Sequence, residues 1–178
     1  MAELVNIAGD GLPLYLWATF ARPEQSAWDV GRERARLGLG GFAYKNTVVR
    51  EVVGKVAACL IGYPNSDSPP PPSGLALPGP LVPLMELSNF VTSTWYLNVL
   101  ATFPDHRGKG YATELLQFAE SMARDSGHSQ MSLIMSDANA GARRMYEKNG
   151  FAEYACRPIV KDKWEHAGQN WILMVRDL

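Results

Sequence analysis

The order of apolar and polar positions along the chain predicts short helices first and a mixture of strands and helices afterwards. Apolar residues recur at helical spacing over 2–8 and 14–21, and Pro23-Glu24-Gln25 begins a third helix that ends near Leu37. Two runs rich in β-branched residues follow at 44–53 and 56–63, joined by a turn at Val53-Gly54-Lys55. This pattern is typical of an antiparallel hairpin.

The second half of the chain alternates between strand and helix patterns. Strands are predicted at 94–102, 130–135, 151–159 and 169–175, and a short helix at 84–90. A longer helix is predicted from Gly110 to Arg124, and its apolar face consists of Leu115, Leu116, Ala119, Met122 and Ala123. Either Asp137 or Ser136 is expected to cap a further helix, which ends at Asn149-Gly150.

A proline-rich segment interrupts this pattern between about 64 and 83. It contains eight of the chain's twelve prolines, including four in succession at 69–72. Consecutive prolines cannot form the hydrogen bonds of a strand ladder and favour an extended conformation. We therefore interpret the segment as an exposed loop insertion, and a polyproline ligand for a partner domain is the alternative.

Composition narrows the class of protein. A chain of 178 residues with 47% hydrophobic and 20% charged residues fits a single globular domain over 1–178. The net charge of −1 gives no overall preference for nucleic acid or an anionic membrane. No apolar run reaches the length of a membrane span, and no signal peptide is visible. Cys59 and Cys156 lie in strand-like runs and are expected to be buried, reduced thiols of a cytoplasmic protein. No metal site is predicted.

The stretch between the strand 94–102 and the helix after it has the features of an anion-binding turn. Gly108 and Gly110 allow the backbone to approach a ligand closely, and Arg107 and Lys109 supply positive charge. The first amides of a helix lack intrahelical partners and carry partial positive charge. The turn is therefore predicted to bind a diphosphate.

The spacing within this turn excludes two common phosphate-binding motifs. A P-loop requires Gly, four residues and then Gly-Lys-Ser/Thr, and the dinucleotide fingerprint requires a third glycine where Thr113 stands. The sequence instead reads Arg-x-x-Gly-x-Ala across Arg107, Gly110 and Ala112, and a second block, Tyr-Glu-Lys followed by Gly-Phe, begins seven residues after Asn139. Over about sixty residues, 95–154, the chain thereby resembles the GNAT superfamily of acyl-CoA-dependent N-acyltransferases.

This resemblance implies a fold. The expected architecture is α/β, with a central mixed, mostly antiparallel sheet, helices on both faces, and two central strands that splay apart to admit the cofactor. Members of the superfamily usually begin with a strand, whereas this sequence begins in an apparent helix after Met1. The first β-strand is therefore expected to be missing, or the start to be placed late. An unpaired sheet edge favours association, so a homodimer is left open.

The resemblance also implies an activity, transfer of an acetyl group from acetyl-CoA to a primary amine by direct attack. Backbone groups of Leu100, Ala101 and Thr102 are expected to pair with the pantetheine arm, together with the side chain of Asn139. The diphosphate would be held by Arg107, Gly108, Lys109, Gly110, Tyr111, Ala112 and Thr113. Tyr146 would donate a hydrogen bond or a proton to the leaving sulfur.

The general base is less well defined by the sequence. The two central strands carry no carboxylate where superfamily members often place a glutamate, since Tyr96, Leu97 and Ile134 occupy those positions. Glu86 or Asn98 acting through water, His166 in the loop 160–168, and the absence of a dedicated base stay open. His106 is a further candidate for phosphate contact. A non-catalytic acyl-CoA-binding sensor and a partner-binding module are the alternative functions.

Overall fold

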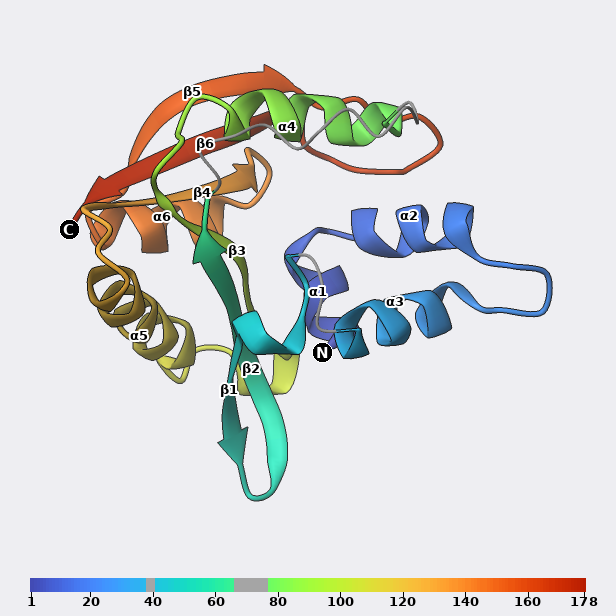
Figure 1. Ribbon diagram of the computed structural model, residues 1–178, viewed down its shortest axis with the longest axis horizontal. Coiled ribbons are helices and arrows are strands. Elements are labelled where there is room, and N and C mark those ends of the chain that lie inside the picture. Colours follow the sequence, from blue (N-terminus) through green and yellow to red (C-terminus); the bar gives the residue numbers. More distant parts are fainter. Residues whose placement is uncertain (38–40, 66–76) are drawn as a thin grey trace. The chain divides into compact units, whose positions relative to one another are not determined.

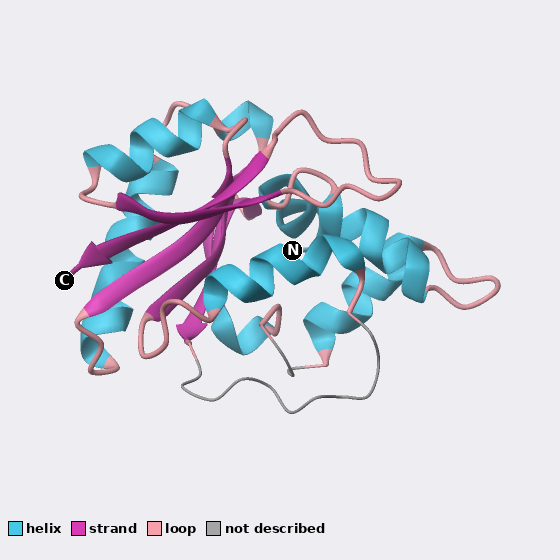
Figure 2. Cartoon of the chain, turned by 90° about the horizontal axis from the view of Figure 1, so that it is seen from above, coloured by secondary structure: helices cyan, strands magenta, loops and turns pink. Residues whose placement is uncertain are grey.

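A computed structural model describes residues 1–37, 41–65 and 77–178. Six strands form a mixed sheet in the order β1-β2-β3-β4-β6-β5 (Figures 1 and 2). The chain forms two compact units, Met1–Tyr63 with Asn98–Ala119, and Pro64–Leu97 with Glu120–Leu178. The predicted α/β class and the mixed sheet are confirmed. The central part of the predicted proline-rich insertion, including the prolines at 69–72, lies outside the described residues.

The first unit begins with three helices, α1 (Ala2–Ala8), α2 (Leu12–Phe20) and α3 (Ala27–Arg36). Among the described residues before Thr47, the remaining regular element is a 3-10 helix at Tyr44–Asn46, so β1 (Thr47–Val52) is the first strand in chain order. The expectation of a missing upstream strand stays a prediction. The hairpin continues with β2 (Lys55–Pro64), which agrees closely with the predicted strand 56–63.

The predicted start of the third helix is wrong. Pro23 does not begin α3; instead, Gln25 donates its backbone N–H to the carbonyls of Arg22 and Pro23 in a turn. The helix begins after Ser26, whose hydroxyl accepts a hydrogen bond from the Asp29 amide, while the Asp29 carboxylate accepts one from the Ser26 amide. This reciprocal capping box satisfies two amides that would otherwise lack partners, and it therefore fixes the boundary.

The core of the first unit joins its helices to its strands. Buried residues from α1, α2, α3, β2 and β3 (Trp95–Thr102) pack in one cluster: Ala2, Leu4, Val5, Trp17, Val30, Cys59, Ile61, Val99 and Ala101. The approach of α3 to α2 depends on Gly31, because a Cβ at this position would lie 2.5 Å from the indole ring of Trp17. The two helices run side by side in Figure 1.

The two cysteines differ in exposure. Cys59 on β2 is buried, and burial raises the pKa of its thiol to about 12. The expectation that both cysteines are buried is wrong for Cys156, which is exposed. Its strand β5 (Ala152–Pro158) is at the edge of the sheet, and most of the side chains of β5 are accessible.

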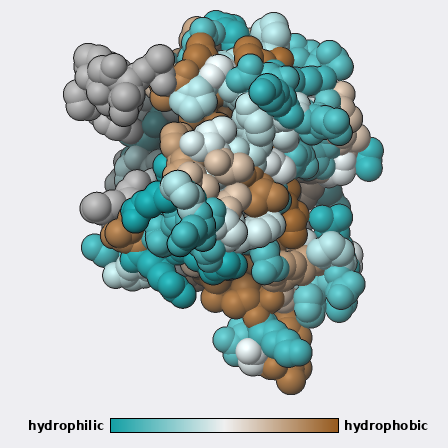
Figure 3. Space-filling view, turned by 90° about the vertical axis from the view of Figure 1, so that its right-hand side faces the viewer, coloured by the Kyte–Doolittle hydropathy of each residue, from teal (hydrophilic) through white to brown (hydrophobic). Residues whose placement is uncertain are grey.

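The β1–β2 turn has an unusual residue at its tip. Val52 pairs with Lys55, so Val53 and Gly54 form a two-residue loop, and both have positive φ, 50° and 72°. Positive φ at both positions defines the type I′ geometry, which strongly favours Asn-Gly. A β-branched residue is strained there, and Val53 is also 96% exposed. Figure 3 shows apolar side chains at the outer end of this hairpin.

Replacing Val53 by asparagine is expected to stabilise the protein by about 1 kcal/mol, because asparagine tolerates the left-handed conformation far better than valine. The change should appear as a higher urea midpoint with an unchanged m-value. Val56→Asn is the matched control, since it makes the same chemical change within the strand and is expected to destabilise through lost β-propensity. An unchanged or lowered midpoint for Val53→Asn would contradict the prediction.

The second unit contains the other end of the sheet. Strand β4 (Gln130–Ser136) pairs in parallel with the Trp95–Leu97 part of β3 and antiparallel with β6 (Asn170–Asp177). Strand β5 pairs antiparallel with the other edge of β6. The unit also contains two short α-helices, α4 (Val82–Ser88) and α6 (Ala140–Lys148). Helix α4 begins before the predicted 84–90, because Pro83 is accommodated in its first turn, where the missing N–H has no intrahelical acceptor.

A bulge in β5 allows this strand to contact a helix on each face of the sheet. The register shifts between Glu153 and Ala155, so Glu153 is opposite Met174 and Arg157 is opposite Trp171. Directly opposed residues share a face, and successive residues of β6 alternate between faces. Glu153 forms an ion pair with Arg143 of α6, whereas Arg157 forms one with Glu86 of α4. Helices α4 and α6 therefore cover opposite faces of β4, β6 and β5.

Helix α5 (Tyr111–Asp125) agrees with its predicted range to within one residue at each end. Four members of its predicted apolar face are buried, Leu115, Leu116, Ala119 and Ala123. Of the helices that the structure describes, none combines the length and the hydropathy needed to cross a membrane.

Candidate active site

The predicted anion-binding turn connects β3 to α5 within the first unit. A single 3-10 turn, Pro104–His106, follows the strand, and α5 begins at Tyr111. Gly108 and Gly110 have φ values of +73° and +83°, and a Cβ added at either position would have no atom within 4 Å. Backbone conformation, rather than packing, therefore requires these two glycines. The space beside them is open to a ligand.

Positive charge is concentrated around this turn. Arg107 Nε donates to the Thr102 carbonyl at 3.4 Å, and Lys109 Nζ donates to the Asp105 carbonyl at 3.1 Å. Both side chains are thus held on the turn while remaining exposed to solvent. The first amides of α5, from Tyr111 onward, lack acceptors within the helix and lie at the positive end of its dipole. This arrangement suits a diphosphate, whose charge it would balance.

The structure adds a cation that sequence reasoning missed. The Arg50 guanidinium on β1 lies over the Tyr111 ring at 5.2 Å, and its Nη1 is 3.3 Å from Glu114. Arg50 Nε and His106 Nδ1 are buried and lack a hydrogen-bond partner among the described residues. His106 also lies beside Tyr111, with ring centroids 6.4 Å apart. Two polar side chains with unsatisfied atoms therefore flank the first residue of α5.

The predicted pantetheine residues are at the end of β3. Ala101 is buried, whereas Leu100 and Thr102 are half-buried. The parallel pairing of β3 with β4 covers Trp95–Leu97, upstream of these residues. The Ala101 side chain belongs to the core of the first unit, whereas Leu100 and Thr102 alternate with it and are partly accessible.

Asn139 and Tyr146 belong to the second unit. Asn139 is the N-cap of α6, and its Oδ1 accepts a hydrogen bond from the Ala142 amide at 3.0 Å. The expectation that Asp137 or Ser136 caps this helix is wrong, because both form other hydrogen bonds at the end of β4. Tyr146 is buried, its ring meets Phe151 edge-on at 5.6 Å, and burial raises the pKa of its phenol. The phenol therefore stays protonated at neutral pH.

A second polar cluster forms where β4 ends. Ser136 Oγ lies 2.7 Å from His166 Nε2 and accepts a hydrogen bond from the Ala138 amide at 3.2 Å. The His166 ring stacks on Trp164 with centroids 4.5 Å apart and an interplanar angle of 8°, and Trp171 lies 6.0 Å from both rings. Trp171 Nε1 is buried without a hydrogen-bond partner in the described part of the chain. Sequence reasoning named His166 but found neither its serine partner nor its aromatic neighbours.

The turn after His166 is held against β4 by Asp137. Its carboxylate accepts hydrogen bonds from the backbone amides of Gln169 and Asn170, each at 2.9 Å. Burial opposes its ionisation, but these hydrogen bonds outweigh burial and hold the pKa of the Asp137 carboxyl below its usual range. Gly168 passes so close that a Cβ would overlap Ser136 Oγ and lie 2.7 Å from His166 Nε2. The cluster therefore requires glycine at this position.

The carboxylate proposed to act through water is already paired. Glu86 Oε2 accepts a hydrogen bond from Arg157 Nε at 2.9 Å, and the Arg157 guanidinium lies over the Phe90 ring at 4.9 Å. The Glu86 carboxylate is thus held by Arg157 of β5.

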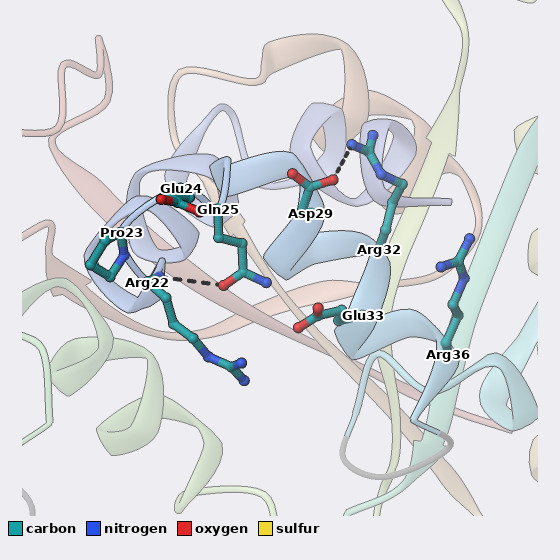
Figure 4. Close-up of a pocket in the computed structure, with 8 residues that line it drawn as sticks. All are labelled: Arg22, Pro23, Glu24, Gln25, Asp29, Arg32, Glu33 and Arg36. Atoms are coloured by element: carbon teal, nitrogen blue, oxygen red, sulfur yellow. Dashed lines mark hydrogen bonds and ion pairs between the residues drawn. The ribbon is translucent and has the colours of Figure 1, made fainter.

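A separate hollow of about 580 Å³ lies along α3 and the turn before it (Figure 4). It is lined by Arg22, Pro23, Glu24, Gln25, Asp29, Arg32, Glu33 and Arg36. The three arginines and three carboxylates balance, and Arg32 pairs with Asp29 at 2.7 Å. None of the residues predicted to bind a cofactor lines it, so we do not place the active site there.

Comparison with known proteins identifies the family. The model of the acetyltransferase (GNAT) family matches residues 13–151, so the chain belongs to this family. Its members are acetyltransferases, and the predicted relationship is confirmed. No curated protein matches the chain.

Solved structures support the fold. An N-acetyltransferase from Staphylococcus aureus Mu50 is 23% identical with a TM-score of 0.66, and the match covers 98% of this chain and 92% of that one. A mosquito arylalkylamine N-acetyltransferase-like protein 5b is 17% identical with a TM-score of 0.62, over 82% and 81% of the two chains. A GNAT family acetyltransferase from Elizabethkingia anophelis with acetyl-CoA bound is 14% identical with a TM-score of 0.53, over 74% and 75%. At these identities the similarity concerns the fold.

Proposed function

We propose that this protein transfers an acetyl group from acetyl-CoA to a primary amine. The observation that carries the proposal is the turn from Arg107 to Thr113. It combines two left-handed glycines beside open space, two tethered cations and the start of a fifteen-residue helix. These features match a diphosphate, the group by which coenzyme A would be held. The family provides independent support.

We assign further contacts along the rest of the coenzyme. Backbone groups of Leu100, Ala101 and Thr102 would pair with the amide-bearing arm as an added strand does. The parallel pairing of β3 with β4 ends at Leu97, before these three residues, which is consistent with this assignment. Asn139 would contribute its Nδ2 group, since its Oδ1 already caps α6. The thioester supplies an activated acetyl group.

Tyr146 is assigned to the leaving sulfur. An unperturbed phenol has a pKa of about 10, and an unperturbed thiol has a pKa of about 8.5. Burial raises the pKa of the Tyr146 phenol further, which makes full proton transfer to the thiolate less favourable. We therefore propose that Tyr146 acts mainly as a hydrogen-bond donor that stabilises the negative charge developing on sulfur.

Calorimetry with coenzyme A, followed by a thiol-release assay over an amine panel, tests this function. The panel should include arylalkylamines, which the name of the mosquito relative suggests, together with polyamines, amino sugars and peptides. Binding with thiol release supports the transferase. Binding without release on any amine would favour a non-catalytic acyl-CoA sensor, and absence of binding would refute both.

A further inference from the structure

The Ser136–His166 pair has a defined position relative to the other residues of the second unit. Ser136 is the last residue of β4 and lies opposite Trp171, which lies opposite Arg157. Directly opposed residues of antiparallel strands share a face of the sheet, so Ser136, Trp171 and Arg157 lie on one face. Helix α4 covers this face, because Glu86 of α4 forms an ion pair with Arg157. Helix α6, which carries Asn139 and Tyr146, covers the other face.

This position is suited to an acceptor rather than to the coenzyme. Asn139, assigned to the coenzyme, follows Ser136 by only three residues, yet its helix covers the opposite face from His166. A nucleophile must approach the thioester carbon from a side that the acyl donor does not fill. His166 thus lies at the end of β4, close to Asn139, on the face that α6 leaves open to an amine.

We propose that His166 is the general base that takes a proton from the acceptor amine, and that Ser136 positions its ring. This proposal rests on the proposed acetyl transfer. In the tautomer we assign, Nε2–H donates to Ser136 Oγ, whose second lone pair accepts the Ala138 N–H. The lone pair of Nδ1 is then available to the amine. Both hydrogen bonds persist when the ring gains a proton, so the ring keeps its orientation.

The acceptor nitrogen loses two protons during the reaction. The amine arrives as an ammonium, one N–H bond breaks, and its proton goes to Nδ1. The freed nitrogen lone pair forms the C–N bond while the C–S electron pair moves to sulfur. A second N–H proton ends on the departing sulfur, next to which Tyr146 is placed, and Nδ1 releases its proton to solvent afterwards.

Aromatic and charged groups from several elements face the ring. Trp164 stacks on His166 with ring centroids 4.5 Å apart. The Asp137 carboxylate is nearby, because the Cβ position at Gly168 lies 2.8 Å from Asp137 Oδ1 and 2.7 Å from His166 Nε2. Glu86 and Arg157 on the same face neutralise each other, and Lys163 and Glu165 border the histidine in its own loop.

His166→Gln tests the proposal, with His128→Gln as its matched control. His128 also bonds to a serine hydroxyl, Ser126 Oγ at 3.0 Å, but at the end of α5. We expect His166→Gln to lower kcat/KM for an alkylamine by about tenfold or more at neutral pH. The loss in kcat/KM should be small for the O-alkyl hydroxylamine of equal length, which is already neutral. The loss for the alkylamine should shrink as rising pH deprotonates this substrate. Coenzyme A affinity and the melting temperature should stay at wild-type values, as should all properties of His128→Gln.

A second variant tests the positioning role of Ser136. Gly168→Ala, which would force Ser136 and His166 apart, should reproduce the selective loss with the alkylamine. A wild-type rate for His166→Gln with the alkylamine, or an equal loss with both nucleophiles, would overturn the proposal while leaving acetyl transfer intact. A wild-type protein that releases no thiol with any amine would instead overturn the proposed function, and this inference with it.

Discussion

Replacing Gly110 by glutamate is expected to abolish measurable binding of acetyl-CoA. The new carboxylate would project from the start of α5 into the open space beside the turn, where we place the diphosphate. Two like charges about 4 Å apart repel by about 4 kcal/mol at an effective dielectric constant of about 20. This energy corresponds to a loss in affinity of more than about 100-fold. Calorimetric titration with coenzyme A measures the effect.

Gly127→Glu is the matched control for this variant. Gly127 has nearly the same φ, +81° against +83°, and the same open space around a built Cβ, but it follows the C-terminal end of α5. Both variants therefore carry the same backbone strain and the same added charge. Wild-type affinity for Gly127→Glu with lost affinity for Gly110→Glu would locate the binding site at the turn. Equal affinities for the two variants would remove the diphosphate assignment.

The second large effect is expected from Tyr146→Phe, which should lower kcat by about 10- to 100-fold through loss of one hydrogen bond to a developing negative charge. The edge-on contact with Phe151 survives the change, so the fold should be retained. Coenzyme A affinity should change little, because the hydroxyl is assigned to the transition state rather than to ground-state binding. Steady-state thiol release and calorimetry together separate the two effects.

Tyr154→Phe removes the same atom from an exposed ring on β5 and should leave turnover unchanged. A wild-type kcat for Tyr146→Phe would discard the role of this tyrosine. A loss of coenzyme affinity in parallel with kcat would assign the hydroxyl to binding instead.

The parts of this protein that the sequence predicts well are those specified locally. The stretch from Asn98 to Thr113 combines the end of β3, two glycines and the start of α5 in continuous sequence, and α5 begins within one residue of its predicted start. The hairpin turn at Val53-Gly54 is correct for the same reason. The start of α3 was missed because Pro23 resembled a first helical residue, whereas the reciprocal Ser26–Asp29 cap determined the boundary.

The remaining features depend on pairing between distant segments. Arg50 precedes Tyr111 by about sixty residues, and Ser136 precedes His166 by thirty. The periodicity of apolar residues predicts which face of a helix or strand is buried. It does not predict which residues of another element contact that face. The cap of α6 was ambiguous because Ser136, Asp137 and Asn139 are all good capping residues. Asn139 caps the helix, whereas Ser136 bonds to the His166 ring and Asp137 bonds to Gln169 and Asn170.

The extra residue in β5 determines which side chains of this strand correspond to those of its relatives. Glu153 and Arg157 would face the same way in a regular strand, but the irregularity at Tyr154 sends their charges to different helices. A homologue that lacks one residue here would reverse the orientation of one end of its strand. Gapless alignment across this position would then equate side chains that lie on opposite sides of the sheet.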